Sequence, residues 1–185
     1  MLLRIQALSD GLLLGLWRLP AARPQAMRQE ERTAAHDLLA AMLGRPVAIR
    51  HNADGAPAID GYHISISHTR GFIAILLSRH RRVGVDIEFR SDRIRRIAPR
   101  FLRPDEPATT LDDLLLCWCV KEAVFKLRSA SHLTYQQMRV RLDDAQADDL
   151  LAADSLPFAY ELTPDYVLVW TSEEEPRQQV APAAQ

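Results

Sequence analysis

Cysteine is scarce in this chain, with only Cys117 and Cys119 among 185 residues. The two lie two residues apart in a stretch predicted to be helical, so their side chains point in different directions. A disulfide or a zinc site between them is therefore not expected. Free thiols packed as small apolar side chains, in a reducing compartment, are the simpler interpretation.

The chain also lacks a large net charge and a long uninterrupted apolar run. A formal net charge of −1 argues against general binding to polyanions. The apolar residues near the N-terminus are interrupted by Arg4, Gln6 and Asp10, which fits neither a signal peptide nor a membrane span. We therefore expect a cytoplasmic protein, and a hydrophobic content of 48% is enough for a packed core of one domain or two small fused halves.

Two carboxylates stand out in the β-branched run from residue 83 to residue 88. Side chains alternate along an extended strand, so Asp86 and Glu88 point the same way while Val85 and Ile87 point into the core. Such a strand offers a platform of two carboxylates. Taken alone, the pattern is usually a solvated strand face.

A third carboxylate and a lysine occur on a predicted helix over residues 111–127, which Thr109 or Thr110 can cap. Glu122 and Lys126 are four residues apart and share a helix face, which is also the spacing of an ordinary surface ion pair. Three carboxylates that leave room for water and phosphate oxygens are typical of Mg²⁺ at phosphoryl-transfer sites. Lys126 would then balance phosphate charge.

The two stretches together are far more specific than either one. They read Gly84-Val85-Asp86-Ile87-Glu88 and Trp118-Cys119-Val120-Lys121-Glu122-Ala123-Val124-Phe125-Lys126. In this order and at this separation they resemble the signature of the 4′-phosphopantetheinyl transferase superfamily, G-[VI]-D-[IVL]-E followed by W-x-x-K-E-[AS]-x-x-K. The segment from Ser65 to Thr69 resembles the N-[IV]-S-H-[ST] element of that family, and Phe101 with Asp105 or Glu106 resembles its F-x-x-x-E element.

The resemblance implies an α/β (α+β) fold with two pseudo-symmetric halves, each with a long helix packed on a small antiparallel sheet. It places the coenzyme A side in residues 1–84 and the metal and carrier-protein side in residues 85–171. Residues 172–185 are expected to form a disordered tail because they are rich in Glu, Gln, Pro and Ala. The length suits the longer, monomeric type of the family better than its short trimeric type.

The activity implied is transfer of the 4′-phosphopantetheine group from coenzyme A to a serine of an acyl or peptidyl carrier protein, with Mg²⁺ and release of 3′,5′-ADP. By resemblance, Asp86, Glu88 and Glu122 hold the metal, Lys126 stabilises the phosphorus, and Glu122 or Glu88 accepts the serine proton. The alternatives are a non-catalytic relative that binds carrier proteins or nucleotides and an unrelated metal-dependent phosphatase.

Coenzyme A, as co-substrate, is expected to contact a set of polar side chains. These are Ser67, His68, Asp86, Lys126, Arg32, His36 and Arg23. The chain departs from the family where G-K-P becomes Gly55-Ala56-Pro57 and where His36 replaces an arginine. Unless Arg32, one helical turn earlier, compensates, affinity for the 3′-phosphate should fall and dephospho-coenzyme A should be accepted well.

Arginines are concentrated after Glu88, on a predicted helix whose apolar side is Ile94, Ile97 and Phe101. We expect Arg93, Arg96 and Arg100 to dock an acidic carrier protein, although a solvated helix face explains such a charge run as well. Nucleic acid is a poorer candidate because the total charge is near zero and few aromatic residues accompany the arginines.

The remaining elements are predicted from periodicity and turn residues. We expect a hairpin over residues 2–8 and 12–19, a helix opening at Pro24 and ending before Gly44, and strands over 62–68, 72–78, 133–135, 138–142, 158–162 and 167–171. The strand beginning at Phe72 should pair with the Asp86 strand as its antiparallel neighbour. That arrangement puts His68 and Asp86 at opposite ends of neighbouring strands unless the sheets bend, an alternative that the sequence leaves open.

Overall fold

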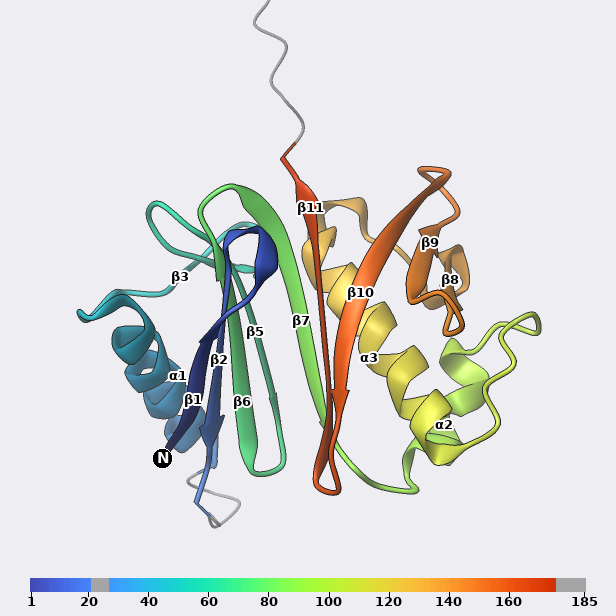
Figure 1. Ribbon diagram of the computed structural model, residues 1–185, viewed down its shortest axis with the longest axis horizontal. Helices are drawn as coiled ribbons and strands as arrows, with labels where there is room; N and C mark the ends of the chain where they lie inside the picture. Colours follow the sequence, from blue (N-terminus) through green and yellow to red (C-terminus); the bar gives the residue numbers. More distant parts are fainter. Residues whose placement is uncertain (21–26, 176–185) are drawn as a thin grey trace, which may run out of the picture.

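Two antiparallel sheets pack face to face, and a long helix covers the outer side of each (Figure 1). The computed structural model describes residues 1–20 and 27–175. Within these residues, no helix is both long enough and apolar enough to cross a membrane. The mixed α/β architecture agrees with the predicted fold class.

The first sheet has the strand order β1-β2-β6-β5. Its strands are β1 (Leu2–Ala7), β2 (Leu12–Arg18), β5 (His63–Thr69) and β6 (Phe72–Ser78). Helix α1 (Met27–Leu43) covers its outer face, and the short strands β3 (Arg50–His51) and β4 (Pro57–Ala58) pair beside it. The predicted N-terminal hairpin is confirmed, while the expected start of the helix at Pro24 lies outside the described residues.

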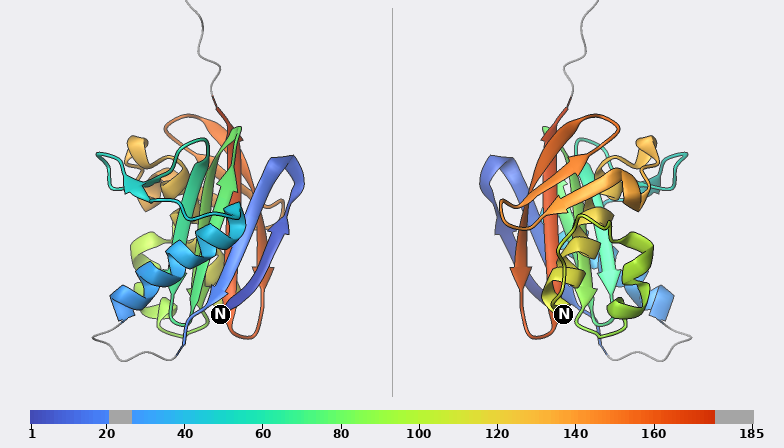
Figure 2. Two further views of the ribbon diagram at one scale, coloured as in Figure 1. Left: turned by 90° about the vertical axis from the view of Figure 1, so that its left-hand side faces the viewer. Right: turned by 90° about the vertical axis from the view of Figure 1, so that its right-hand side faces the viewer.

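The second sheet has the order β7-β11-β10-β9-β8. Its strands are β7 (Arg81–Phe89), β8 (Met138–Arg141), β9 (Gln146–Asp149), β10 (Asp154–Leu162) and β11 (Tyr166–Glu174). Helices α2 (Ile94–Phe101) and α3 (Leu111–Leu127) lie on its outer face, opposite α1, as the side views in Figure 2 show.

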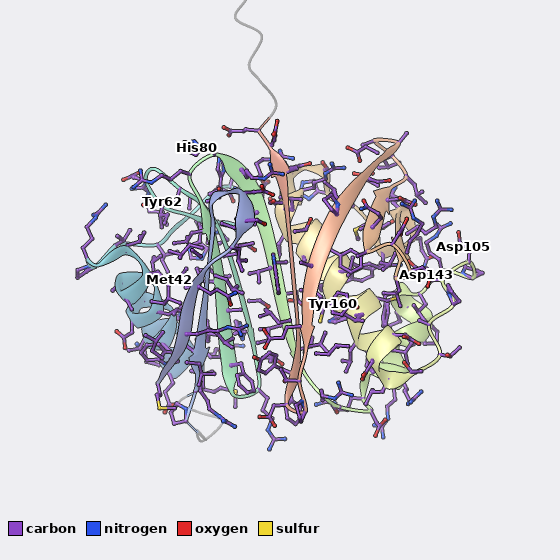
Figure 3. The ribbon with its side chains drawn as sticks, viewed as in Figure 1. Met42, Tyr62, His80, Asp105, Asp143 and Tyr160 are labelled. Carbon is purple, nitrogen blue, oxygen red and sulfur yellow. The ribbon has the colours of Figure 1, made fainter. Side chains whose placement is uncertain are left out.

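Apolar side chains from both sheets form the central layer. Leu14 and Leu76 of the first sheet meet Val85, Ile87 and Leu168 of the second, so Val85 and Ile87 point into the core as predicted. On the outer face of the first sheet, a Cβ atom at Gly15 would lie 2.5 Å from Sδ of Met42, which Figure 3 labels on α1. Glycine at this position lets α1 lie close to β2.

Helix α3 has the predicted ends because its N-terminus is capped by its own sequence. The Thr110 hydroxyl accepts a hydrogen bond from the Asp113 amide, and the Asp113 carboxylate accepts one from the Thr110 amide. This capping box satisfies amides that have no partner inside the helix. Burial of ten of its side chains then holds the helix against the second sheet.

Several predicted elements need correction. Residues 133–135 do not form a strand, because Tyr135 begins a short 3₁₀ turn (Tyr135–Gln137) after α3. The predicted start of a disordered tail at residue 172 is too early, because strand β11 continues through Glu174, which pairs with Arg81 of β7.

Candidate active site

Strand β7 and helix α3 lie in direct contact at Gly84. A Cβ atom at this position would stand 2.0 Å from the carbonyl oxygen of Ala123, so only glycine allows the helix backbone to come this close. Asp86 and Glu88 follow on the same face of β7, two and four residues later. The close approach therefore brings Glu122 and Lys126 of α3 beside the carboxylates of β7.

A row of hydroxyl groups on β5 joins the two sheets. Backbone amides of β7 donate to side-chain oxygens of β5 in place of a backbone ladder. The pairs are Val85 with Ser65, Ile87 with Ser67, and Phe89 with Thr69, at 3.0, 3.3 and 3.1 Å. Since the residue numbers increase together, β5 and β7 run parallel, and the alternation of Ser65, Ser67 and Thr69 is explained by this seam.

This seam overturns the expected relation of His68 to Asp86. Strand β7 pairs with β11 rather than with β6, so the turn after Ser78 carries the chain from one sheet to the other. Ser67, the residue before His68, donates a hydrogen bond to Oδ1 of Asp86 at 2.7 Å. The two segments are thus neighbours rather than being at opposite ends of paired strands.

Asp86 is the most deeply buried of the three acids, with 5% of its side chain exposed. The Lys126 ammonium group lies 2.6 Å from Oδ1 and also donates to the carbonyl oxygen of Val85 at 3.2 Å. The second oxygen, Oδ2, is buried and has no hydrogen-bond partner within residues 1–20 and 27–175. Because unpaired buried carboxylate oxygens are costly, this atom is a candidate position for a ligand.

Glu88 receives a hydrogen bond on each of its oxygens. Thr69 donates to Oε2 and the indole of Trp118 donates to Oε1, both at 3.0 Å. Burial, followed by the negative charge of Asp86, raises the pKa of Glu88 above its ordinary value. Neutral donors therefore hold this carboxylate from both sides.

Glu122 is held on one side only. The Tyr135 hydroxyl donates to Oε1 at 2.6 Å, and no other side-chain hydrogen bond reaches this carboxylate in the described part of the chain. Burial raises the pKa of Glu122, and the charge of Asp86 raises it further. Glu122 shares its helix face with Lys126, whose ammonium group reaches Asp86 on the facing strand.

The three carboxylates do not form a ready-made metal cluster. Across the described residues, no three histidine, cysteine or acidic side chains are grouped so as to hold a metal ion. Their oxygens are instead directed to Lys126, Ser67, Trp118 and Tyr135. The buried, unpartnered Oδ2 of Asp86 and the all-oxygen donor set nevertheless suit a hard divalent cation.

A pocket of about 780 Å³ opens between α1, β3 and β5. Three of the predicted coenzyme contacts, Arg32, His36 and His68, line it together, whereas Arg23 lies outside the described residues. The other polar side chains in its wall are Arg28, Glu31 and His51. Cationic and imidazole groups outnumber the single carboxylate, so the pocket favours an anionic ligand.

Ser67 and His68 link this pocket to the carboxylates. Because they are consecutive in a strand, their side chains leave β5 on opposite faces. Ser67 reaches Asp86, while His68 lies in the pocket with Nδ1 3.5 Å from the Glu31 carboxylate. One strand thus contributes to both parts of the site.

The arginines of α2 are exposed on the surface. Ile94 and Phe101 point inward, whereas Arg93, Arg96 and Arg100 are exposed, and none of the three forms an ion pair with another described residue. This exposure leaves their charges available to a partner.

The two acids proposed for the F-x-x-x-E element have different environments. Glu106 is buried beside Lys121, whereas Asp105 is an exposed residue at the outer edge of the molecule (Figure 3). Glu106 therefore belongs to the core, and Asp105 belongs to the surface.

The sequence did not point to some residues that the structure brings to the site. Tyr135 falls in a segment that the sequence predicts to be a strand, and no pattern marks it as a partner of Glu122. His51 and Glu31 lie in no recognisable pattern. Trp118 and Thr69 stood inside the quoted motifs, but their donation to Glu88 depends on the packing of α3 and β5 against β7.

Comparison with known proteins identifies the family of this chain. A family model described as the 4′-phosphopantetheinyl transferase superfamily matches residues 82–184, which is more than half of the chain. The chain therefore belongs to the 4′-phosphopantetheinyl transferase superfamily. A comparison with curated protein sequences found no significant match.

Proposed function

We propose that this protein transfers the 4′-phosphopantetheine group of coenzyme A to a serine of an acyl or peptidyl carrier protein. The observation that carries the proposal is the contact of Lys126 on α3 with Asp86 on β7, in the matched region, with Glu122 on the same face of the helix and Glu88 on the same face of the strand. Family membership supplies the class of reaction, and this arrangement supports catalysis rather than binding alone.

Glu122 is the better candidate for the proton acceptor. Both oxygens of Glu88 already accept hydrogen bonds, whereas Oε2 of Glu122 has no donor in the described part of the chain. In the proposed step the carrier serine oxygen attacks the β-phosphorus of coenzyme A and forms the new P–O bond. The bond from that phosphorus to the bridging oxygen breaks, 3′,5′-ADP leaves with the electron pair, and the serine proton passes to Glu122.

The residues that would hold Mg²⁺ are Asp86, Glu88 and Glu122. When bound, the metal would supply charge neutralisation on the pyrophosphate. The side chain of Lys126, already directed toward Asp86, contributes a positive charge to the same place. Ser67 and Thr69 orient Asp86 and Glu88 from the neighbouring sheet.

We further propose that coenzyme A lies with its nucleotide end in the pocket that contains Arg32, His36 and His68, and with its pyrophosphate beside Asp86. The support is that β5 carries both Ser67 and His68. On this proposal the first sheet with α1 forms the coenzyme half and the second sheet with α3 forms the metal and carrier half, in a pseudo-symmetric arrangement.

The carrier protein is proposed to dock on Arg93, Arg96 and Arg100. Arg96 and Arg100 lie on α2 and Arg93 directly precedes it, and α2 packs against α3 near Trp118. Arginine pairs with carboxylates and steers the encounter with an acidic surface. Which pathway supplies the carrier is a separate question that the test below can address by using several carriers.

The direct test is mass spectrometry of apo carrier proteins after incubation with the full chain, coenzyme A and Mg²⁺. We expect a phosphopantetheine adduct on the carrier serine and an equimolar yield of 3′,5′-ADP. Glu122→Gln should lower the rate at least about 100-fold, the lower end of general-base contributions. Asp143→Asn is the matched control, because Asp143 lies at the outer edge of the molecule (Figure 3).

The alternatives give different results in the same experiment. A protein that binds carrier or nucleotide but yields no adduct on any of several carriers would be a non-catalytic relative. Cleavage of coenzyme A without a carrier would identify a phosphatase. Either result overturns the proposed transfer.

A further inference from the structure

Tyr135 contacts the candidate base although it lies outside every motif that led to the family. It begins the 3₁₀ turn Tyr135–Gln137, and its hydroxyl donates to Oε1 of Glu122 at 2.6 Å. This is the one side-chain hydrogen bond to the Glu122 carboxylate within the described ranges. Among the described residues, the Tyr135 hydroxyl is therefore the side-chain donor that orients the Glu122 carboxylate.

The tyrosine is itself held in place at its ring and at its backbone. Its ring packs against Trp118 with centroids 5.3 Å apart, and Trp118 packs against Phe101 at 5.1 Å. Its main-chain carbonyl accepts a hydrogen bond from the fully buried ammonium group of Lys121 at 3.1 Å. With both ring and backbone fixed, the hydroxyl has little freedom, which is the condition for orienting a neighbouring group.

The aromatic pair connects the two glutamates. Trp118 donates to Glu88 from its indole nitrogen, and Tyr135 donates to Glu122 from its hydroxyl, while the two rings lie against each other. A strand carboxylate and a helix carboxylate are thus positioned by one rigid unit. Both donors are neutral, so they fix the acids without cancelling their negative charge.

The contact leaves the two oxygens of Glu122 in different states. Oε1 is engaged by Tyr135, and Oε2 accepts no hydrogen bond from the residues that the structure describes. Lys126, the nearest candidate cation on the same helix face, is directed to Asp86 instead. One oxygen of Glu122 is therefore held and the other is available.

We propose that Tyr135 is a positioning residue for Glu122: its hydroxyl fixes Oε1 so that Oε2 is presented to the divalent cation or to the serine proton. This inference rests on the proposed function for the role of Glu122 and adds a residue to which the family resemblance gave no role. It predicts that removing one oxygen atom from Tyr135 weakens the site while leaving the packing of its ring unchanged.

The test compares Tyr135→Phe with Tyr160→Phe in the full chain. Phenylalanine keeps the ring contact with Trp118 and removes only the hydroxyl. Tyr160, labelled on β10 in Figure 3, is 45% exposed, and its hydroxyl makes no hydrogen bond with the described residues, so it is the matched control. Two quantities are measured: the affinity for Mn²⁺ in the presence of 3′,5′-ADP, by electron paramagnetic resonance, and the steady-state rate of carrier modification.

Loss of a group that orients a metal ligand typically costs about 10-fold to 100-fold in metal affinity or activity. We expect Tyr135→Phe to lower kcat about tenfold and to weaken Mn²⁺ binding by a similar factor, with the KM for coenzyme A changed less than about twofold. In the Glu122→Gln background the same substitution should have no further effect on Mn²⁺ affinity, because the tyrosine acts through that carboxylate. Tyr160→Phe should change neither quantity.

The inference fails if Tyr135→Phe keeps the wild-type kcat and Mn²⁺ affinity, even when its melting temperature falls, since that result would show a purely structural role. Failure of the proposed function looks different. If the wild type modifies no carrier but Tyr135→Phe still binds Mn²⁺ more weakly than the wild type, the positioning role stands and the transfer does not. A wild-type protein that neither binds Mn²⁺ nor modifies a carrier overturns both.

Discussion

Replacing Lys121 by methionine should destabilise this protein far more than any substitution on its surface. The side chain is fully buried, and its ammonium group is 2.8 Å from Oε2 of Glu106. It also donates to the carbonyl oxygens of Phe101 and Tyr135, at 2.7 and 3.1 Å. All three of its protons are used, so the charge is both neutralised and fully hydrogen-bonded.

Glu106 depends on this cation. Both of its oxygens are buried, and it accepts backbone hydrogen bonds from Arg103 and Val140 at 2.8 and 2.7 Å. Methionine matches lysine in shape but carries no charge, so Lys121→Met leaves a buried carboxylate with amide donors alone. Breaking a buried pair in this way costs about 3–5 kcal/mol. That is a large part of the roughly 5–15 kcal/mol that stabilises a domain.

The measurement is urea denaturation of the variant and the wild type, followed by circular dichroism. Arg95→Met is the control, since Arg95 pairs with Asp92 on the surface, where a lost ion pair costs at most about 1 kcal/mol. A loss below about 1 kcal/mol for Lys121→Met would refute the reasoning. Because Lys121 also anchors the backbone of Tyr135, we expect the folded fraction of this variant to show a reduced kcat.

Three further predictions concern the site and its partners. Burial raises the pKa of Glu122, so the stability that its neutral form gives the fold is lost as pH rises through that raised value. The metal-free Glu122→Gln variant should therefore be more stable than the wild type in urea at pH 7.5, and the difference should shrink toward about pH 4.3. A difference that grows as pH falls would disprove this assignment. A triple variant in which serine replaces Arg93, Arg96 and Arg100 should have a higher KM for the carrier, and this KM should no longer depend on salt concentration. The KM for coenzyme A should be unchanged. Equal changes in the two KM values would exclude carrier docking at these arginines. Ala56→Lys restores the lysine of the family pattern and should lower the KM for coenzyme A about tenfold through a charged hydrogen bond. The KM for dephospho-coenzyme A should stay constant. A parallel fall in both KM values would count against a contact with the 3′-phosphate.

Local sequence is sufficient to predict a feature that depends on a single helix or strand. The ends of α3 follow from the Thr110 cap, and the shared face of Asp86 and Glu88 follows from strand alternation. Strand β9 (Gln146–Asp149) could not be predicted in the same way, because its buried acids look like a solvated loop. Asp148 is instead paired with Arg139 and Arg141.

The parts of the site that were missed depend on contacts between elements. Ser67 reaches Asp86 because β5 runs parallel to β7 across the two sheets, a relation that no single stretch encodes. Tyr135 reaches Glu122 because the turn after α3 folds back onto the helix, where Lys121 holds its backbone. Periodicity describes one segment at a time, so it cannot report such crossings.

The central claim is that the acids of β7 and α3 make this chain a phosphopantetheinyl transferase. Intact mass spectrometry of several apo carrier proteins, each incubated with the wild type, coenzyme A and Mg²⁺, tests it most directly. The account predicts that at least one carrier gains a single phosphopantetheine group on serine, and that Asp86→Asn abolishes this gain without unfolding the protein. Carriers that all keep their apo mass, or an Asp86→Asn variant with full activity, would contradict it.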